Sequence, residues 1–197
     1  DWDVTFVLDG EDASASQAIK NGMAKSKNDY RVEVIQHGGA QKARNHGGKL
    51  AKGEFLCFFD ADCVIEVDIA AQWVKAFDKD KDIGFVYGGY RFLDEQGAID
   101  SEQFDPWLLK VRNYISGCFP LRREFYPGWN ESLKSLQDWD FWLSVVEKGA
   151  KGKYLPGHAF ATSYPTAKSI SGQGCTNEVW LDRVNAVKKL HNLPERG

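Results

Sequence analysis

Two carboxylates stand at the end of a hydrophobic run. Residues 54–65 read EFLCFFDADCVI, so Asp60 and Asp62 follow directly after the run 55–59. Such a run predicts a buried strand, and in open α/β sheets ligands bind beyond the carboxyl ends of the strands. Two carboxylates aimed at one point repel each other unless a cation lies between them, and oxygen ligands favour Mg²⁺ or Mn²⁺. The pair therefore predicts a divalent cation that bridges the protein to a diphosphate, although a strand-ending Asp that caps the next helix is the alternative.

Strands and helices, which must position this carboxylate pair, are expected to alternate along the first 80 residues. Apolar, β-branched runs bounded by Gly and Asp predict strands, and apolar residues four apart among helix formers predict helices. The expected strands are 4–8, 30–36 and 55–59, and the expected helices are 14–26, 40–52 and 67–80. This alternation indicates an α/β fold with a mainly parallel sheet flanked by helices.

The remainder of the chain has a different pattern. Extended segments are expected at 83–99, with a turn at 95–97, and at 117–126, and helices at 104–115, 137–149 and 177–191. No internal repeat or linker interrupts the sequence. We therefore expect a single domain over residues 1–197, with two halves at 1–80 and 81–175 and a C-terminal helix within 176–197.

Composition limits the classes of protein that fit this chain. It has 197 residues, of which 43% are hydrophobic and 27% charged, and a net charge of −3, which disfavours general nucleic-acid binding. No apolar run approaches the roughly 20 residues that span a bilayer, and no signal peptide is visible. The four cysteines (Cys57, Cys63, Cys118 and Cys175) have no CxxC spacing, so neither a zinc site nor a disulfide framework is indicated. We expect a cytoplasmic, reduced protein, with peripheral contact to the inner membrane face as an alternative.

The sequence around the carboxylate pair resembles glycosyltransferase family 2, whose members have the GT-A fold. The matching features, in the family's order, are Gly38-Gly39, Ala43-Arg44-Asn45, Ala51-Lys52-Gly53-Glu54, the run 55–59 and Asp60-Ala61-Asp62. A second block, residues 116–149, is similar to the family's acceptor-side segment, which ends in Glu-Asp-(Trp/Tyr)-Asp at a helix start. The resemblance extends over residues 3–172.

The resemblance implies an inverting transferase that moves a sugar from a UDP- or GDP-sugar to a carbohydrate or another hydroxyl acceptor. Residues 1–80 would bind the nucleotide, and residues 81–175 would bind the acceptor. In the family the Asp-x-Asp binds the donor through Mg²⁺ or Mn²⁺, so Asp62 would be the main metal ligand. Asp60 would share the metal or contact the ribose, and the cation would offset charge on the departing diphosphate.

Three more residues would line the nucleotide pocket. Asp9, at the end of the first expected strand, matches the family's Asp that contacts the base or ribose. Arg44 and Asn45 match residues of the same pocket. The residues alone allow other roles: Asp9 also fits a turn beside Gly10, and Arg44 and Asn45 also fit a solvated helix face with local packing. The start of the helix after Gly39 could also face anionic oxygens.

Asp138 matches the family's general base. It would take the proton of the acceptor hydroxyl while that oxygen attacks the anomeric carbon from the face opposite the diphosphate. A helix N-cap is the alternative role for Asp138, and the two are compatible. Trp129, Trp139 and Asp140 would lie on the acceptor side, where the tryptophans could stack on a sugar, although tryptophan beside a helix start is more often part of the core.

The sequence departs from the family pattern at three places. The family's opening strand and its Pro-Thr-Tyr-Asn-like turn are not seen, so the visible chain is expected to begin at the second strand. Gln137 replaces the usual Glu. Thr166 stands where many members carry a His that completes the metal shell, and His158 lies nearby in the sequence but out of register.

Two other functions remain open from the sequence. A non-catalytic glycosyltransferase-like domain that binds a sugar or a partner would explain the missing strand and the missing His. A haloacid-dehalogenase-like phosphatase would use Asp60 as nucleophile and Asp62 as acid/base. The phosphatase alternative leaves the Ala-Arg-Asn block unexplained.

Overall fold

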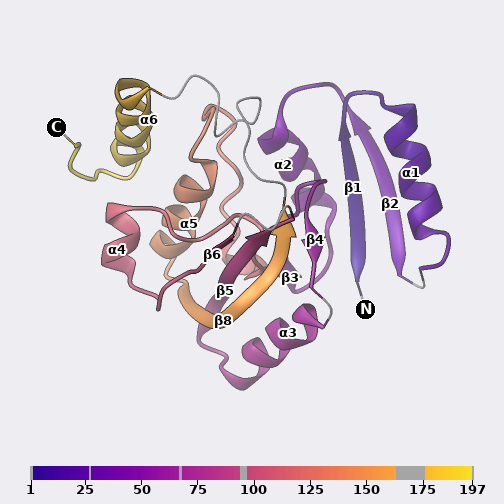
Figure 1. Cartoon of the computed structure of the whole chain (residues 1–197), viewed down its shortest axis with the longest axis horizontal. Coiled ribbons are helices and arrows are strands. Elements are labelled where there is room, and N and C mark those ends of the chain that lie inside the picture. Colours follow the sequence, from indigo (N-terminus) through magenta and orange to yellow (C-terminus); the bar gives the residue numbers. More distant parts are fainter. Residues whose placement is uncertain (1, 27, 67, 94–96, 163–175, 197) are drawn as a thin grey trace.

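The computed structural model describes residues 2–26, 28–66, 68–93, 97–162 and 176–196 (Figure 1). The strands are β1 (Asp3–Asp9), β2 (Asp29–Ile35), β3 (Phe55–Leu56), β4 (Val64–Ile65), β5 (Ile83–Phe92), β6 (Ala98–Ile99), β7 (Leu121–Arg122) and β8 (Lys151–Thr162). The helices are α1 (Ala13–Met23), α2 (Ala40–Leu50), α3 (Ile69–Lys79), α4 (Pro106–Val111), α5 (Gln137–Glu147) and α6 (Asn177–Leu190), and η1 (Arg123–Phe125) is a short 3-10 helix. The expected alternation of strand and helix over the first 80 residues is confirmed.

The strands form two sheets. β1 and β2 pair in parallel from Asp3↔Asp29 to Asp9↔Ile35. The second sheet has the order β3-β7-β5-β8-β4, with β6 paired to β5. Within it β5 and β8 are parallel and the shorter pairings are antiparallel. The α/β class is confirmed, and the two longest ladders are the parallel ones.

The core lies around β5, whose residues Ile83–Gly89 are all buried. Because this stretch is covered on both faces, its sequence is a nearly continuous apolar run rather than an alternating one. Trp73 and Phe77 of α3 contribute to the core, and α5 contributes Trp142, whose ring centre lies 4.7 Å from that of Phe85. In Figure 1, α1 and α2 lie beside β1 and β2, whereas α4, α5 and α6 lie toward the opposite end of the molecule.

Helix starts follow from local capping chemistry. The carboxylate of Asp12 accepts the N–H of Ala15 at 2.9 Å and caps α1. Asp105 caps α4 in the same way, and Pro106 occupies its first turn, where a missing N–H costs nothing. α2 begins after Gly39, whose φ of +95° is a conformation that favours glycine.

Several elements differ from the sequence-based expectations. β3 ends at Leu56 rather than at residue 59, because its ladder partner β7 is itself only two residues long. α4 is shorter than the expected helix 104–115. β8 was not predicted, because Pro156 and Gly157 interrupt its strand pattern, and its ladder with β5 contains three register shifts. Residues 95 and 96 of the expected turn lie outside the described residues.

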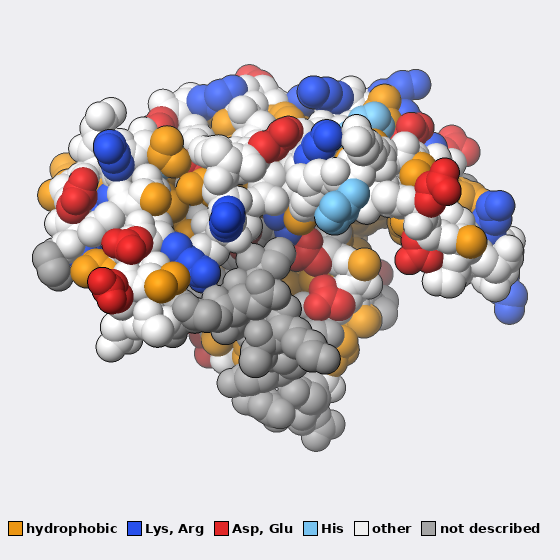
Figure 2. Space-filling view, turned by 90° about the horizontal axis from the view of Figure 1, so that it is seen from above, with side chains coloured by type: hydrophobic (Ala, Val, Ile, Leu, Met, Phe, Trp, Pro, Cys, Tyr) orange, Lys and Arg blue, Asp and Glu red, His pale blue; other side chains and the backbone are white. Residues whose placement is uncertain are grey.

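None of the described helices is both long and apolar enough to cross a membrane. On the face that Figure 2 shows, basic, acidic and hydrophobic side chains are interspersed over the described part of the surface.

Candidate active site

The carboxylate pair lies in an exposed turn between β3 and β4. The N–H of Cys63 donates to the carbonyl oxygen of Asp60 at 3.1 Å, which closes the turn around Ala61 and Asp62. The side chain of Asp62 has no hydrogen bond or ion pair to any residue in the described part of the chain. Both carboxylates are exposed, so both are open to a ligand.

Arg44 reaches this turn from α2. Its Nη2 atom lies 2.5 Å from Oδ1 of Asp60, and its guanidinium carbon lies 4.5 Å from the ring centre of Trp129. The side chain of Arg44 is 17% exposed and that of Asp60 is 50% exposed. Half-open ion pairs of this kind contribute little to stability. The main effect of the contact is therefore to orient Asp60.

Asp138 lies in the first turn of α5, close to Arg44. The backbone N–H of Gly117 donates to Oδ2 of Asp138 at 2.9 Å. Leu136 is the N-cap of α5 and no side chain caps the helix, so the N-cap alternative for Asp138 is wrong. Burial raises the pKa of Asp138 above its ordinary value; the charge of Arg44 and the Gly117 N–H act in the opposite direction, and Asp60 adds to the increase. Asp138, Arg44 and Asp60 therefore interact electrostatically at one place.

Two thiols border the same place, and no local sequence pattern predicts their proximity. The Sγ atoms of Cys63 and Cys118 lie 3.9 Å apart. Cys63 follows Asp62 in the carboxylate turn, and Cys118 follows Gly117, which holds Asp138. The two cysteines are far apart in the sequence, so no local spacing rule could have paired them.

Asp9 supports the start of α2. Its two carboxylate oxygens accept the N–H groups of Gly38 and Gly39, at 2.7 Å and 2.9 Å, and His37 Nδ1 lies 2.9 Å from Oδ2. Although burial acts in the opposite direction, these partners lower the pKa of Asp9. Asp9 thus orders the glycine turn, and its contact with a nucleotide stays a prediction.

Asn45 connects α2 to the segment 126–131. Its Oδ1 accepts the hydroxyl of Tyr126 at 3.0 Å and the N–H of Trp129 at 2.7 Å. Its Nδ2 donates to the carbonyl of Trp129 and to Glu131, both at 2.8 Å. This arrangement corresponds to the local packing that the sequence allowed as an alternative, and a nucleotide contact by Asn45 stays a prediction.

The three residues expected on the acceptor side are buried. Trp139 is 2% exposed and its Nε1 donates to the carbonyl of Leu109. Trp129 is 3% exposed and stacks on Phe141 with ring centres 4.2 Å apart. Arg44 also lies against the ring of Trp129, so little of its surface is open to a sugar. These placements favour the core role that the sequence also allowed.

Asp140 faces a different partner from Asp138. Nε2 of His191, at the end of α6, lies 3.1 Å from Oδ1 of Asp140, and Nδ1 of the same ring lies 2.8 Å from Glu147. Burial lowers the pKa of His191, but the hydrogen bonds to Asp140 and Glu147 outweigh it, so the pKa is raised. Asp140 therefore connects α5 to α6, and a contact with an acceptor stays a prediction.

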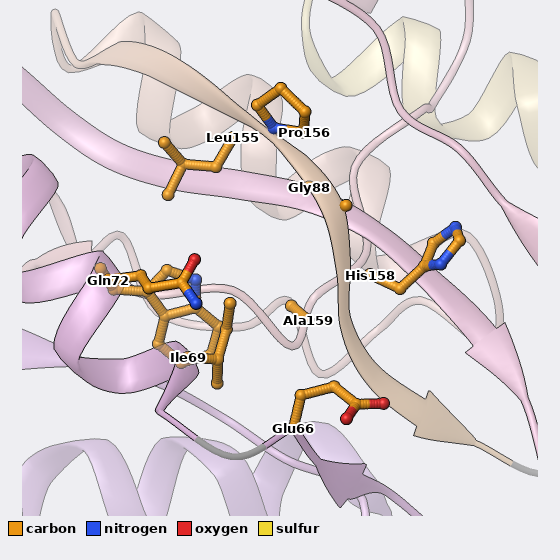
Figure 3. Close-up of a pocket in the computed structure, with 10 residues that line it drawn as sticks. Glu66, Ile69, Gln72, Gly88, Leu155, Pro156, His158 and Ala159 are labelled. Atoms are coloured by element: carbon orange, nitrogen blue, oxygen red, sulfur yellow. The ribbon is translucent and has the colours of Figure 1, made fainter.

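Two cavities lie outside the carboxylate site. One, of about 210 Å³, lies between α3 and β8: Figure 3 shows Ile69 and Gln72 from α3 and Leu155, Pro156 and His158 from β8 around it. The other, of about 610 Å³, is lined by residues of α2, α5 and the segment 126–130, and by Leu190 and His191. Asp60, Asp62 and Asp138 are not among the lining residues of either cavity.

The carboxylate turn fits a hard cation only in part. No group of three or more His, Cys, Asp or Glu side chains in the described residues is arranged to hold a metal ion. Two exposed carboxylates do suit a cation such as Mg²⁺, which usually takes one or two carboxylates and completes its shell with water and phosphate. Thr166 lies outside the described residues, and His158 pairs with Asp100 at 3.0 Å.

Solved structures define the class of fold. The chain is similar to S. aureus TarS 1–349 in complex with UDP-GlcNAc, with a TM-score of 0.76 and 18% identity over 95% of this chain and 56% of that chain. It is also similar to the mannosyltransferase PcManGT from Pyrobaculum calidifontis in complex with GDP-Man and Mn²⁺, with a TM-score of 0.63 and 16% identity over 96% of this chain and 53% of that chain. The fold is therefore the GT-A fold of nucleotide-sugar transferases.

The sequence comparison gives the family. Residues 1–130 match Glycosyl transferase family 2, and the chain belongs to this family. An uncharacterized glycosyltransferase of Methanocaldococcus jannaschii is 24% identical over 164 residues, which cover 77% of this chain and 56% of that protein. The chain spans only part of the length of such relatives, for example 17% of the chondroitin synthase of Pasteurella multocida and 58% of an uncharacterized glycosyltransferase of Haemophilus influenzae.

Proposed function

We propose that this chain transfers a sugar from a nucleotide-diphosphate donor to a hydroxyl acceptor, with inversion at the anomeric carbon. The observation that carries the proposal is the meeting of Asp60, Arg44 and Asp138, from three separate segments, at one partly exposed place. Family membership supports glycosyl transfer over phosphoester hydrolysis. The UDP-GlcNAc and GDP-Man complexes of similar structures support a UDP- or GDP-sugar as donor.

In this proposal Asp138 is the general base. Its Oδ2 is held by the Gly117 N–H, which leaves Oδ1 to accept the proton of the acceptor hydroxyl. Burial raises its pKa, and a carboxylate with a raised pKa is a stronger base. The fixed carboxylate also orients the incoming oxygen, and such positioning supplies a large part of the acceleration in bimolecular transfer.

Asp62 and Asp60 are the residues that would hold a divalent cation, Mn²⁺ or Mg²⁺, with the remaining ligands coming from water and the diphosphate. Such an ion, when bound, supplies Lewis-acid stabilisation of the negative charge on the leaving nucleoside diphosphate. Arg44 fixes one oxygen of Asp60, which stands two residues before Asp62 in the same turn. The Mn²⁺ in the PcManGT complex supports this assignment.

The proposal assigns the nucleotide to residues 1–80 and the acceptor to 81–175, with 176–197 as a C-terminal helix in one domain. Asp9, Arg44 and Asn45 remain candidate neighbours of the nucleotide through the start of α2. Trp129 and Trp139 are core residues and Asp140 connects α5 to α6, and a contact of these three residues with a carbohydrate acceptor stays a prediction. The cytoplasmic location also stays a prediction.

Calorimetry with the full chain tests this proposal. UDP and GDP are titrated with and without Mn²⁺, and transfer is then assayed from the matching nucleotide sugars, with the anomeric configuration of the product read by NMR. Mn²⁺-dependent binding and an inverted product are expected. Failure of both nucleotides to bind favours the non-catalytic alternative, and hydrolysis of generic phosphoesters without nucleotide sugar favours the phosphatase alternative.

A further inference from the structure

The thiols of Cys63 and Cys118 are close enough to react with each other. Their Sγ atoms are 3.9 Å apart, and a disulfide joins its two sulfurs at about 2.05 Å. Cys63 is partly exposed, whereas Cys118 is buried behind it. An oxidant from solvent would therefore meet Cys63 first, with Cys118 in place to react next.

The segment that carries Cys118 is held firmly. The N–H of Cys118 lies 3.3 Å from the hydroxyl oxygen of Ser116, and the indole N–H of Trp142 donates to the Ser116 carbonyl at 3.0 Å. The Cys57 thiol donates to the backbone carbonyl of Cys118 at 3.4 Å, although Cys57 also lies near enough to Cys63 to interact with it electrostatically. Cys63, by contrast, lies in the exposed carboxylate turn.

We propose that Cys63 and Cys118 are a redox-modification site at which a hydroperoxide forms a reversible disulfide that lowers donor binding. The hydroperoxide oxidises the Cys63 thiol to a sulfenic acid and is itself reduced to the alcohol, or to water when it is hydrogen peroxide. The Cys118 sulfur then attacks the Cys63 sulfur: the S–S bond forms, the S–O bond breaks, and the oxygen leaves as water with the Cys118 proton. Two electrons pass from the thiol pair to the peroxide.

The disulfide would move the carboxylate turn relative to Asp138. The sulfurs must approach by nearly half their present distance, to about 2.05 Å, and the exposed turn yields more easily than the buried segment. Because Cys63 follows Asp62 directly, Asp62 moves with it. The loss of donor binding rests on the proposed function, whereas formation of the bond does not.

The first experiment detects the bond itself in the full chain. All proteins in this experiment carry Cys175→Ser. Cys175 lies outside the described residues, and its removal leaves only Cys57, Cys63 and Cys118 to be titrated. After hydrogen peroxide treatment, two of the three remaining thiols should be lost to a titration under denaturing conditions. Peptide mapping should find a Cys63–Cys118 link that dithiothreitol removes. Cys57→Ala should show the same loss, and Cys63→Ser should prevent it. A link through Cys57, or oxidation of Cys63 to a sulfinic acid without any link, would overturn the proposal.

The second experiment measures the consequence. Mn²⁺-dependent binding of UDP and GDP is compared before and after oxidation, and the oxidised protein should bind about tenfold more weakly, the size of effect seen when support around a metal site is lost. Dithiothreitol should restore binding, and Cys63→Ser should be insensitive to peroxide. Unchanged affinity in a fully cross-linked protein would refute the control of donor binding. If the reduced protein binds neither nucleotide, the proposed function fails, and the thiol titration still decides whether the disulfide exists.

Discussion

The backbone N–H of Gly117 donates a hydrogen bond to Oδ2 of Asp138 over 2.9 Å, and this approach depends on the missing side chain of residue 117. A Cβ atom there would lie 2.8 Å from Oδ1 of Asp138 and 2.7 Å from Cη2 of Trp129. The ring of Trp129 has little room to withdraw, because it is buried, stacks on Phe141 and has the guanidinium of Arg44 4.5 Å from its centre. The position of the proposed base, Asp138, therefore depends on residue 117 being glycine.

Gly117→Ala should therefore displace Asp138 and reduce both stability and transfer. Overpacking of this kind costs about 1–3 kcal/mol of unfolding free energy. Urea unfolding measures that cost, and initial rates measure the transfer. Gly22→Ala is the matched control, because a Cβ at position 22 of α1 meets nothing within 4 Å. The control should gain up to about 1 kcal/mol from helix propensity. Equal stability and equal rates for the two variants would contradict the close packing at Gly117.

Asp138→Asn should abolish transfer without weakening donor binding. The amide has nearly the same shape but cannot accept the proton, so the rate should fall by about 10²–10⁴-fold. Initial rates give the loss, and calorimetry with UDP, GDP and Mn²⁺ gives the donor affinity. A variant that transfers sugar at the wild-type rate would remove Asp138 from the role of base.

The pH dependence of the wild-type chain should reflect the raised pKa of Asp138. Its carboxyl keeps its proton in the folded state at pH values above the ordinary 3.8, so kcat/KM should rise with pH through the raised pKa. Over the same window the free energy of unfolding should fall, because the unfolded chain has already released this proton. Asp138→Asn should lack this component of the stability profile. An acid limb at or below 3.8 would contradict the raised pKa.

Asp62→Asn should remove the metal dependence of donor binding. Replacing the proposed metal ligand should weaken Mn²⁺-dependent nucleotide affinity by at least about tenfold, since even supporting residues around metals have effects of that size. Asp68→Asn is the control, because Asp68 is also exposed, makes no capping hydrogen bond and has a left-handed backbone that Asn tolerates. Calorimetry across a Mn²⁺ series compares the two. The same loss in both variants would point to net charge rather than to a specific ligand.

The attachment of α6 should weaken as the pH rises above 6.5. The pKa of His191 is raised from 6.5, so its charged contacts with Asp140 and Glu147 contribute fully below pH 6.5 and are lost as pH rises through the raised value. Hydrogen exchange of the α6 amides below and well above pH 6.5 measures this change. In His191→Gln the α6 amides should exchange faster than in the wild type at low pH. Their protection should then change little over the pH range in which His191 of the wild type loses its charge. Equal protection of α6 at all pH values in the wild type would contradict the prediction.

The fold was predictable where structure is local. Periodicity located the six alternating elements of the first 80 residues to within a few positions, because each element has its own local pattern of apolar residues. β8 escaped detection, because Pro156 and Gly157 break its pattern and its pairing with β5 depends on irregularities in the ladder that no local rule describes. β3 is shorter than the expected strand 55–59, because its pairing ends where its partner strand β7 ends.

The sequence motifs predicted the main residues of the candidate site, but they did not predict which residues contact each other. The motifs pointed to Asp60, Arg44 and Asp138, which the fold brings together. Asp140 was grouped with Asp138, although residues two apart on a helix lie about 200° apart around its axis and face different partners. Gly117 and Cys118 carry no local signal, since their importance comes only from what the fold places against them.

The four hydrogen bonds of Asn45 have a mechanical consequence. They fasten the helix that presents Arg44 to the segment 126–131, which contains Trp129, so we expect these two parts of the molecule to move together. A nucleotide that shifted α2 on binding would therefore also shift the segment 126–131, before any acceptor is bound. Binding of the nucleotide donor would in this way alter the site that the acceptor then enters.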